Sequence, residues 1–418
     1  MTGRTIRFFL IVIISALIGY YVGVSKISFA WKSYHPTIKV ADKMPPASVQ
    51  NLDLTMFWNV LEKLETSYYD KSAINSQKLL NGAISGMVEG LEDPYTVYLP
   101  PVQNTDFKQG LAGKFEGIGA ELGMNGKQII VVAPLDGSPA QKAGIKAGDA
   151  ILKVDDQMTF GWTIAQAVEK IRGPKGTNVT LNILHKNAEK TEDIVIVRDT
   201  ITVKSVNYWV KRIKDIDEIT AIKGHENDSV AYIRLSQFGD NTNDEWVQIA
   251  NTIDLARKNN PGVKGVVLDL RNNPGGYLTD AVFIASEFVK SGVIVMQEDR
   301  SGNRNKLSVS RRGLLTDFPV VVLINKGSAS ASEIVAGALR DHNRATLVGE
   351  TSFGKGTIQQ ADELGGGAGL HITIAKWLTP DGTWVHIKGL EPDVKVDVDA
   401  KNQAHDLQLE KAVAELVK

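Results

Sequence analysis

The second half of the chain alternates short apolar runs with amphipathic runs, and this alternation restricts its fold more than any other feature. Runs typical of strands cover residues 230–235, 263–270, 293–297, 320–324 and 346–348, and helical patterns cover 244–258, 278–290 and 332–340. Strands that alternate with helices predict a layered sheet with some parallel pairs. In such a sheet, chemistry gathers in the loops that follow the carboxyl ends of the strands.

Two glycine-bearing loops follow predicted strands and therefore lie where such chemistry is expected. The first covers residues 269–276 and ends in two glycines, and the second covers 325–333 and alternates Ser with Ala around Ser330. A tight strand-to-helix turn of this kind exposes a hydroxyl and directs backbone N–H groups into the same space, as an acyl-transfer nucleophile requires. Helix capping is the alternative interpretation, because Ser330 and Glu333 match the S-x-x-E capping box.

A serine nucleophile needs a base, and lysine is the stronger candidate in this chain. Lys355 stands between Gly354 and Gly356 after the predicted strand at 346–348, so the backbone can close around its amine. A buried lysine loses proton affinity and can act as a general base near neutral pH. None of the seven histidines lies in a glycine-framed motif. Three of them remain open as bases: His342, His371 and His386.

Several other chemistries are excluded by composition and spacing. The chain has no Cys, which removes disulfides, thiolate metal sites and a cysteine nucleophile. A net charge of −1 supplies no global field for nucleic acid. Residues 354–357 lack the spacing of a phosphate-binding loop, because Gly356 separates Lys355 from Thr357. No metal-ligand motif is present, so we expect neither a metal nor a cofactor.

Residues 105–199 have a different pattern from the second half of the chain, with short strands predicted at 129–132 and 150–154 around one helix. This block resembles a PDZ domain over its whole length. Its candidate binding residues form a glycine-framed turn and one helix position: Gly117, Ile118, Gly119, Ala120 and Val168. The N–H groups of the turn can converge on a peptide carboxylate, while Ile118 and Val168 would bind the last apolar side chain. The alternative is that the glycines only make a tight turn.

The amino-terminal segment predicts a membrane helix. Arg4 and Arg7 precede the uncharged apolar run 8–24, which is close to the shortest length that spans a bilayer, about 17 residues. Basic residues before this run place the N-terminus in the cytoplasm and the body on the extracytoplasmic (periplasmic) side of a single-pass membrane protein. A cleaved secretory signal is the alternative, because residues 28–30 resemble a cleavage site. Both interpretations export the body.

Three motifs that follow the PDZ-like block carry a more specific resemblance. The runs 269–276, 327–333 and 354–360 are similar to those of the carboxy-terminal processing proteases, a family of exported serine peptidases, and the similarity extends over about residues 50–400. The resemblance implies that Ser330 is the nucleophile, Lys355 the general base and Gln359 the residue that orients the lysine amine. A developing oxyanion also needs preorganised donors. The candidates are the backbone N–H groups of Ala331, Gly275 and Gly276.

We therefore expect a mixed α/β multidomain protein. Its segments are a membrane anchor or signal (1–30), a linker (31–49), a helical region (50–104), a PDZ domain (105–199), a layered α/β protease core (200–400) and a C-terminal helix (401–418). The resemblance implies that the PDZ domain captures nonpolar C-termini of protein substrates for cleavage at the dyad. It leaves open an adaptor or lipoprotein partner. The amphipathic tail either packs locally or mediates homo-oligomerisation. A tail-binding scaffold that does not cut, and an esterase or amidase that uses Ser330, are the alternative functions.

Overall fold

The computed structural model describes residues 13–15, 27–32, 35–40, 52–135, 137–186, 188–397 and 405–418. The chain divides into one compact unit over residues 1–80 and a second over 81–418. Apart from residues 13–15, the predicted membrane run 8–24 lies outside the described residues. None of the helices in the described ranges combines the length and the apolar character needed to cross a bilayer.

The first unit contains a hairpin that crosses the boundary expected between the anchor or signal (1–30) and the linker (31–49). Strands β1 (Ile27–Lys32) and β2 (His35–Val40) pair antiparallel, and the helix α2 (Thr55–Ser67) follows them. A short helix η2 (Lys71–Ala73) separates α2 from α3 (Ser76–Glu89), which continues past residue 80 into the second unit. The hairpin is consistent with the period-two alternation of apolar residues along β1. Both helices lie within residues 50–104, where a helical region was expected.

The helix α4 (Pro101–Leu111) leads into the PDZ domain and crosses the boundary expected at residue 105. Proline at the first helical position favours its start at Pro101. The domain itself comprises β4 (Lys114–Gly117), β5 (Ala120–Asn125), β6 (Gln128–Pro134), α5 (Pro139–Lys142), β7 (Ala150–Val154), β8 (Gln157–Met158), α6 (Ile164–Ile171), β9 (Asn178–Leu184), β10 (Glu192–Val197) and β11 (Asp199–Thr202). Its main sheet has the order β10-β9-β7-β6-β5, so β5 and β10 are edge strands.

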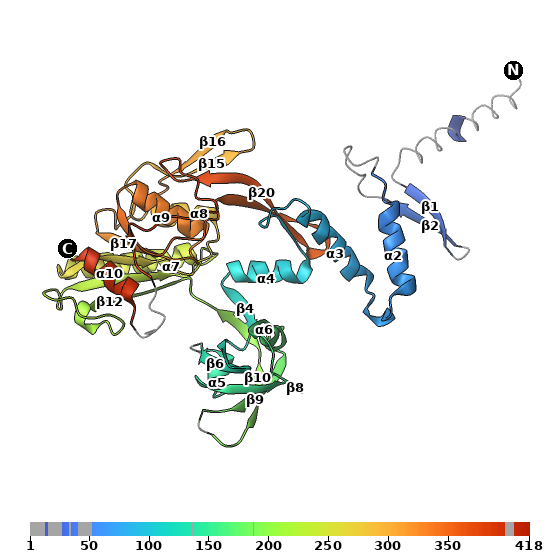
Figure 1. The fold of residues 1–418 in the computed structure, drawn as a ribbon, viewed down its shortest axis with the longest axis horizontal. Coiled ribbons are helices and arrows are strands. Elements are labelled where there is room, and N and C mark those ends of the chain that lie inside the picture. Colours follow the sequence, from blue (N-terminus) through green and yellow to red (C-terminus); the bar gives the residue numbers. More distant parts are fainter. Residues whose placement is uncertain are drawn as a thin grey trace, which may run out of the picture. The chain divides into compact units, whose positions relative to one another are not determined.

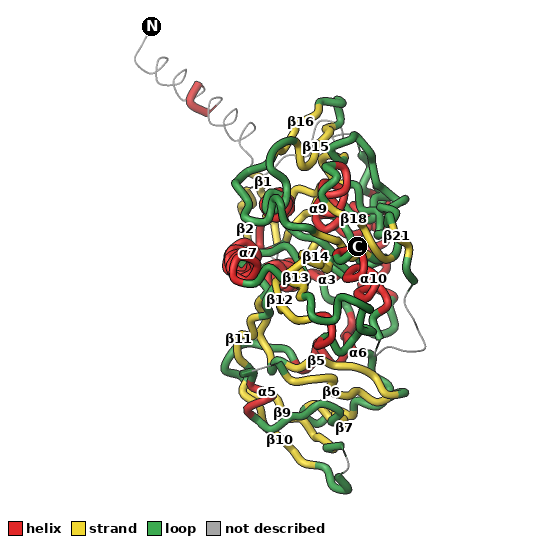
Figure 2. Tube along the Cα trace, turned by 90° about the vertical axis from the view of Figure 1, so that its left-hand side faces the viewer, coloured by secondary structure: helices red, strands yellow, loops and turns green. Residues whose placement is uncertain are grey.

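A largely parallel sheet forms the centre of the protease core. Its order is β12 (Val206–Arg212), β13 (Ser229–Leu235), β14 (Val263–Asp269), β17 (Val320–Ile324), β18 (Ala345–Gly349) and β21 (Val394–Lys395), and only β12 pairs antiparallel. Strands β12, β13 and β14 run side by side (Figure 2). The layered sheet with parallel pairs predicted from the alternation is therefore present.

Helices cover both faces of this sheet (Figure 1). Alternate residues of β14 and β17 pack in two separate clusters, one with the helices α7 (Thr242–Asn259), α8 (Leu278–Ala285) and α9 (Ala331–Asp341), the other with α10 (Leu407–Leu416). The second cluster includes Leu409, Ala412 and Val413 of α10. The C-terminal tail thus packs locally, as one of its two interpretations predicted.

A second, antiparallel sheet completes the core. Its order is β16 (Arg304–Ser308), β15 (Val293–Asp299), β20 (Gly369–Leu378) and β19 (Thr357–Glu363), and β3 (Val97–Leu99) pairs with β20. Two short helices, η3 (Ile213–Asp215) and η4 (Gly365–Gly367), lie in connections. Strand β3 precedes the PDZ domain in the sequence, whereas the antiparallel sheet that it joins comes after that domain. This pairing places the segment around β3 next to the loop that carries Lys355.

Candidate active site

A cavity of about 630 Å³ in the protease core is lined by all six residues predicted for catalysis and the oxyanion hole. These residues are Ser330, Ala331, Gly275, Gly276, Lys355 and Gln359. They come from the loop after β14, the turn between β17 and α9, the loop after β18 (Ala345–Gly349) and the strand β19. Because β14 and β17 are adjacent and parallel, their carboxyl ends open at one edge of the sheet. The topology therefore brings the two glycine-bearing loops together.

Ser330 occupies a strained turn directly before α9. Its backbone angles are φ 57° and ψ −117°, a combination that a residue with a side chain rarely adopts. Such strain persists only where the surroundings fix the backbone, and it is common at functional sites. The backbone N–H of Ser330 donates to Glu333 Oε2 at 2.8 Å, so the carboxylate half of the predicted capping box is formed. The side chain of Ser330 lines the cavity.

Glu333 connects the serine loop to the lysine loop. Its side chain is fully buried, and besides the Ser330 N–H its carboxylate accepts the N–H of Lys355 at 2.9 Å and of Gly354 at 2.7 Å. The hydroxyl of Ser352 donates to the same carboxylate at 2.5 Å. The sequence indicated only a capping role for Glu333, because its contacts with the lysine loop depend on tertiary structure. The structure shows that one buried carboxylate holds the backbone of both loops.

Lys355 is half-buried in the cavity, and its backbone carbonyl accepts the indole N–H of Trp377 at 2.8 Å. Burial lowers the pKa of Lys355 below its ordinary value, against the negative charges of Asp93 and Glu333, which favour the protonated amine. The amine lies 5.2 Å from the ring centroid of Tyr95. Within the described residues no hydrogen bond joins this amine to Ser330, although both side chains line the same cavity.

Gln359 lies in the cavity but directs its amide donors elsewhere. Its side-chain nitrogen donates to the hydroxyls of Thr357 at 2.9 Å and Thr373 at 3.1 Å. These bonds fix the amide against β20. The structure therefore brings Gln359 near Lys355 without the direct contact that the resemblance implied.

The two glycines that were candidates for the oxyanion hole differ in their hydrogen bonds. The N–H of Gly275 donates to Asn273 Oδ1 at 2.9 Å, whereas the hydrogen bonds of the described residues do not use the N–H groups of Gly276 or Ala331. A Cβ on Gly275 would lie 2.8 Å from the Cβ of Ser330, and one on Gly276 would lie 1.8 Å from the carbonyl oxygen of Phe238. Gly276 and Ala331 therefore have free donors, and Gly275 allows close approach to the serine.

The predicted peptide-binding residues of the PDZ domain fall into two groups. Gly119 has a φ of 73°, and a Cβ there would lie 2.6 Å from the Cβ of Ser138, so this turn requires glycine. The turn joins Gly117 at the end of β4 to Ala120 at the start of the edge strand β5. Ile118 is only 3% exposed and belongs to the domain core. Of the two pocket candidates, only Val168, half-buried on α6, retains an accessible side chain.

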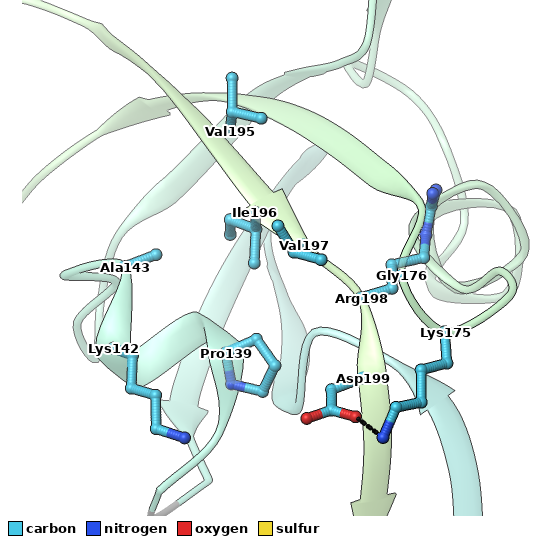
Figure 3. Close-up of a pocket in the computed structure, with 10 residues that line it drawn as sticks. All are labelled: Pro139, Lys142, Ala143, Lys175, Gly176, Val195, Ile196, Val197, Arg198 and Asp199. Carbon is cyan, nitrogen blue, oxygen red and sulfur yellow. Dashed lines mark ion pairs between the residues drawn. The ribbon is translucent and has the colours of Figure 1, made fainter.

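Another cavity, of about 450 Å³, lies on the PDZ domain between α5 and β10 (Figure 3). Val195 and Val197 of the edge strand β10 are more than half exposed there. An ion pair of 2.7 Å joins Lys175 and Asp199 at its rim. This cavity contains none of the residues predicted for catalysis or peptide binding.

Comparisons with known proteins agree with this architecture. The model described as "Peptidase family S41" matches residues 229–396, the model "PDZ domain" matches 130–184, and the model "Activating protease CtpB N-terminal domain" matches 12–101. The chain is 38% identical to the carboxy-terminal processing protease CtpA of Bacillus subtilis (strain 168), over 81% of this chain and 67% of that protein. It is 39% identical to a probable CtpA-like serine protease of Staphylococcus epidermidis, over 83% and 66%. The chain thus spans about two thirds of the length of these curated relatives.

Two solved structures are similar as well. A photosystem II D1 C-terminal processing protease aligns with a TM-score of 0.50 and 30% identity, over 82% of this chain and 93% of that chain. A putative S41 protease from Bacteroides fragilis aligns with a TM-score of 0.55 and 14% identity, over 91% and 100%. The second similarity is one of fold alone. The first extends to the sequence.

Proposed function

Because the chain belongs to the carboxy-terminal processing proteases of peptidase family S41, a family of serine-type peptidases, we propose that it cleaves proteins with a Ser330–Lys355 dyad. One observation carries this proposal. A serine held in a strained turn and a half-buried lysine from separate loops line one cavity, and the buried carboxylate of Glu333 binds the backbone of both loops.

The proposed reaction begins with a neutral amine at Lys355. The amine takes the proton of the Ser330 hydroxyl while the serine oxygen attacks the scissile carbonyl carbon. The N–H groups of Ala331 and Gly276 bind the resulting oxyanion, and removing one such donor typically lowers kcat by about 10²–10³-fold. Collapse of the tetrahedral intermediate leaves an acyl-enzyme, and the protonated Lys355 donates to the leaving amine. Water then hydrolyses the ester with the same lysine as base. The burial of Lys355 supports this role, because it lowers the cost of the neutral form.

Two variants test the dyad against the other functions. We expect Ser330→Ala and Lys355→Ala each to abolish cleavage of an unstructured protein with an apolar C-terminus. Cleavage that survives in Lys355→Ala would contradict the dyad and point to a histidine such as His371, which lines the same cavity. A chain that binds tails without releasing fragments would be a scaffold. One that hydrolyses small esters but leaves polypeptides intact would be another type of hydrolase.

For substrate capture, we propose that the PDZ domain binds the nonpolar C-terminus of a protein as an added strand on β5. Strand β5 is an edge of the sheet and lies against α6, and the turn Gly117–Ala120 precedes it. Backbone N–H groups in such a turn suit a terminal carboxylate. Blocking that carboxylate as an amide should raise KM for the protein substrate and leave kcat nearly unchanged. An unchanged KM would contradict capture through the turn.

We further propose that the body acts outside the cytoplasm, on a membrane anchor. The support is the sequence itself, in which Arg4 and Arg7 precede the uncharged run 8–24. With its body outside the cytoplasm, a protease that acts on protein C-termini meets its substrates after they have been exported.

A further inference from the structure

The amine of Lys355 faces an aromatic ring from a distant part of the chain. Tyr95 precedes the PDZ domain, yet the centroid of its ring lies 5.2 Å from the Lys355 amine. Tyr95 is half-buried and lines the same cavity as Ser330. An ammonium within about 6 Å of a ring centroid is attracted by the negative face of the ring. This contact therefore favours the charged amine.

The segment around Tyr95 is held firmly against the core. The carboxylate of Asp93 accepts the N–H of Tyr95 at 3.0 Å and the hydroxyl of Thr96 at 2.7 Å. The hydroxyl of Thr96 in turn accepts the N–H of Thr373 on β20 at 3.0 Å. The ring of His386 meets that of Tyr95 edge-on, with 6.1 Å between centroids. The Tyr95 ring thus has a fixed place from which to orient a flexible lysine side chain.

The charged and titratable groups near the Lys355 amine do not orient it, and that role is left to the ring of Tyr95. Asp93 and Glu333 act on Lys355 through their negative charge. The carboxylate of Glu333 is occupied by backbone N–H groups and a hydroxyl, and that of Asp93 by its own turn. His371 lines the cavity, and burial together with the charge of Lys355 lowers the pKa of its imidazole. Among the described residues, none of these groups forms a hydrogen bond with the amine.

We propose that Tyr95 is a positioning residue of the dyad: its ring face holds the protonated amine of Lys355 within the cavity and releases the neutral amine toward Ser330. The proposal rests on the dyad proposed above. The ring binds only the charged amine strongly. The contact therefore disfavours the neutral amine, which is the form that accepts the serine proton. Weakening the negative ring face at constant shape should therefore allow Lys355 to lose its proton at lower pH.

A fluorination series tests this role in the full chain. Tyr95 is replaced with phenylalanine, and then with phenylalanines that carry one, two and three ring fluorines, which progressively weaken the negative face. The readout is the pH dependence of kcat/KM for a peptide substrate. We expect Tyr95→Phe to keep most of the activity. Along the series the acid limb should move stepwise to lower pH, by about 0.5–1 pH unit in total.

Two controls separate this role from packing. The same series at Tyr98, a buried neighbour on β3 that does not line the cavity, should leave the acid limb in place. Repeating the Tyr95 series in a His371→Asn background removes the imidazole as a source of the limb. An acid limb that stays fixed along the Tyr95 series, in a chain that still requires Lys355, overturns the proposal for Tyr95 alone. Full activity in Lys355→Ala would overturn the proposed dyad instead.

Discussion

Lys355 is a half-buried amine whose protonation state controls the proposed reaction. Burial lowers its pKa below the ordinary value of 10.5, and the charges of Asp93 and Glu333 oppose that shift. Since the neutral amine is the active form, kcat/KM should rise with pH and level off above the pKa of Lys355 in the folded protein. Asp93→Asn removes a charge that favours the ammonium, so the rise should move to lower pH. A rise that moves to higher pH in this variant, in pH profiles of peptide cleavage, would contradict the assignment.

Glu333 gives a second residue-scale prediction. In Glu333→Gln the side chain loses its charge and presents an NH₂ group to a set of donors, so part of the network that includes Ser330 and Lys355 must break. Losing buried hydrogen bonds to a charged group should cost about 2–4 kcal/mol in free energy of unfolding, with a large fall in kcat. Urea denaturation measures the first effect. Glu169→Gln, an exposed position on α6, is the matched control and should change neither quantity.

Secondary-structure elements were predictable from the sequence where packing follows a simple period. The strands β7 and β17 match their predicted residues, because both are short runs of mostly apolar residues between turns. Helix α8 ends at Ala285, although its apolar pattern continues to residue 290. Just after the end of the helix, the buried carboxylate of Glu287 accepts the N–H groups of Leu314 and Leu315. These residues are far from Glu287 in the sequence, so a local apolar pattern does not indicate the contact. The same limit applies in the cavity, where the carboxylate of Glu333 accepts the N–H groups of Gly354 and Lys355, which are distant in the sequence.

At the scale of elements, α10 offers a paired test of local packing. Leu409 is 4% exposed in the cluster on the parallel sheet, whereas Leu407 of the same helix is 37% exposed. Leu409→Ala should lower the free energy of unfolding by about 2–4 kcal/mol, since it removes buried methyl groups and leaves a cavity. Leu407→Ala should cost much less. The measurement is urea denaturation at several protein concentrations. Equal effects, or a loss that depends on concentration, would favour self-association through the tail.

The α10 helix also connects to the loop that carries the glycines. Arg271, in that loop, donates to Asp406 at the start of α10 and to the fully buried Asp269. Burial alone would raise the pKa of Asp269, but hydrogen bonds and charge from Arg271 hold it below its ordinary value. A carboxylate with a depressed pKa stabilises the fold above its unfolded pKa, and that stability is lost as the pH falls. The glycine loop should therefore be among the parts that loosen in acid.

At the scale of the whole molecule, the sequence predicts that residues 1–30 decide where the chain works. An apolar run behind Arg4 and Arg7 should anchor the expressed full chain in the membrane fraction, resistant to alkaline carbonate, with the body open to protease added from outside. A chain that begins at residue 31 is the matched control and should remain soluble. The cleaved-signal alternative predicts a soluble exported chain, and the mass of its first tryptic peptide would then place its start near residue 31. Replacing both arginines with glutamate removes the orientation signal, so a body that stays fully exported in that variant would show that the basic residues do not set the topology.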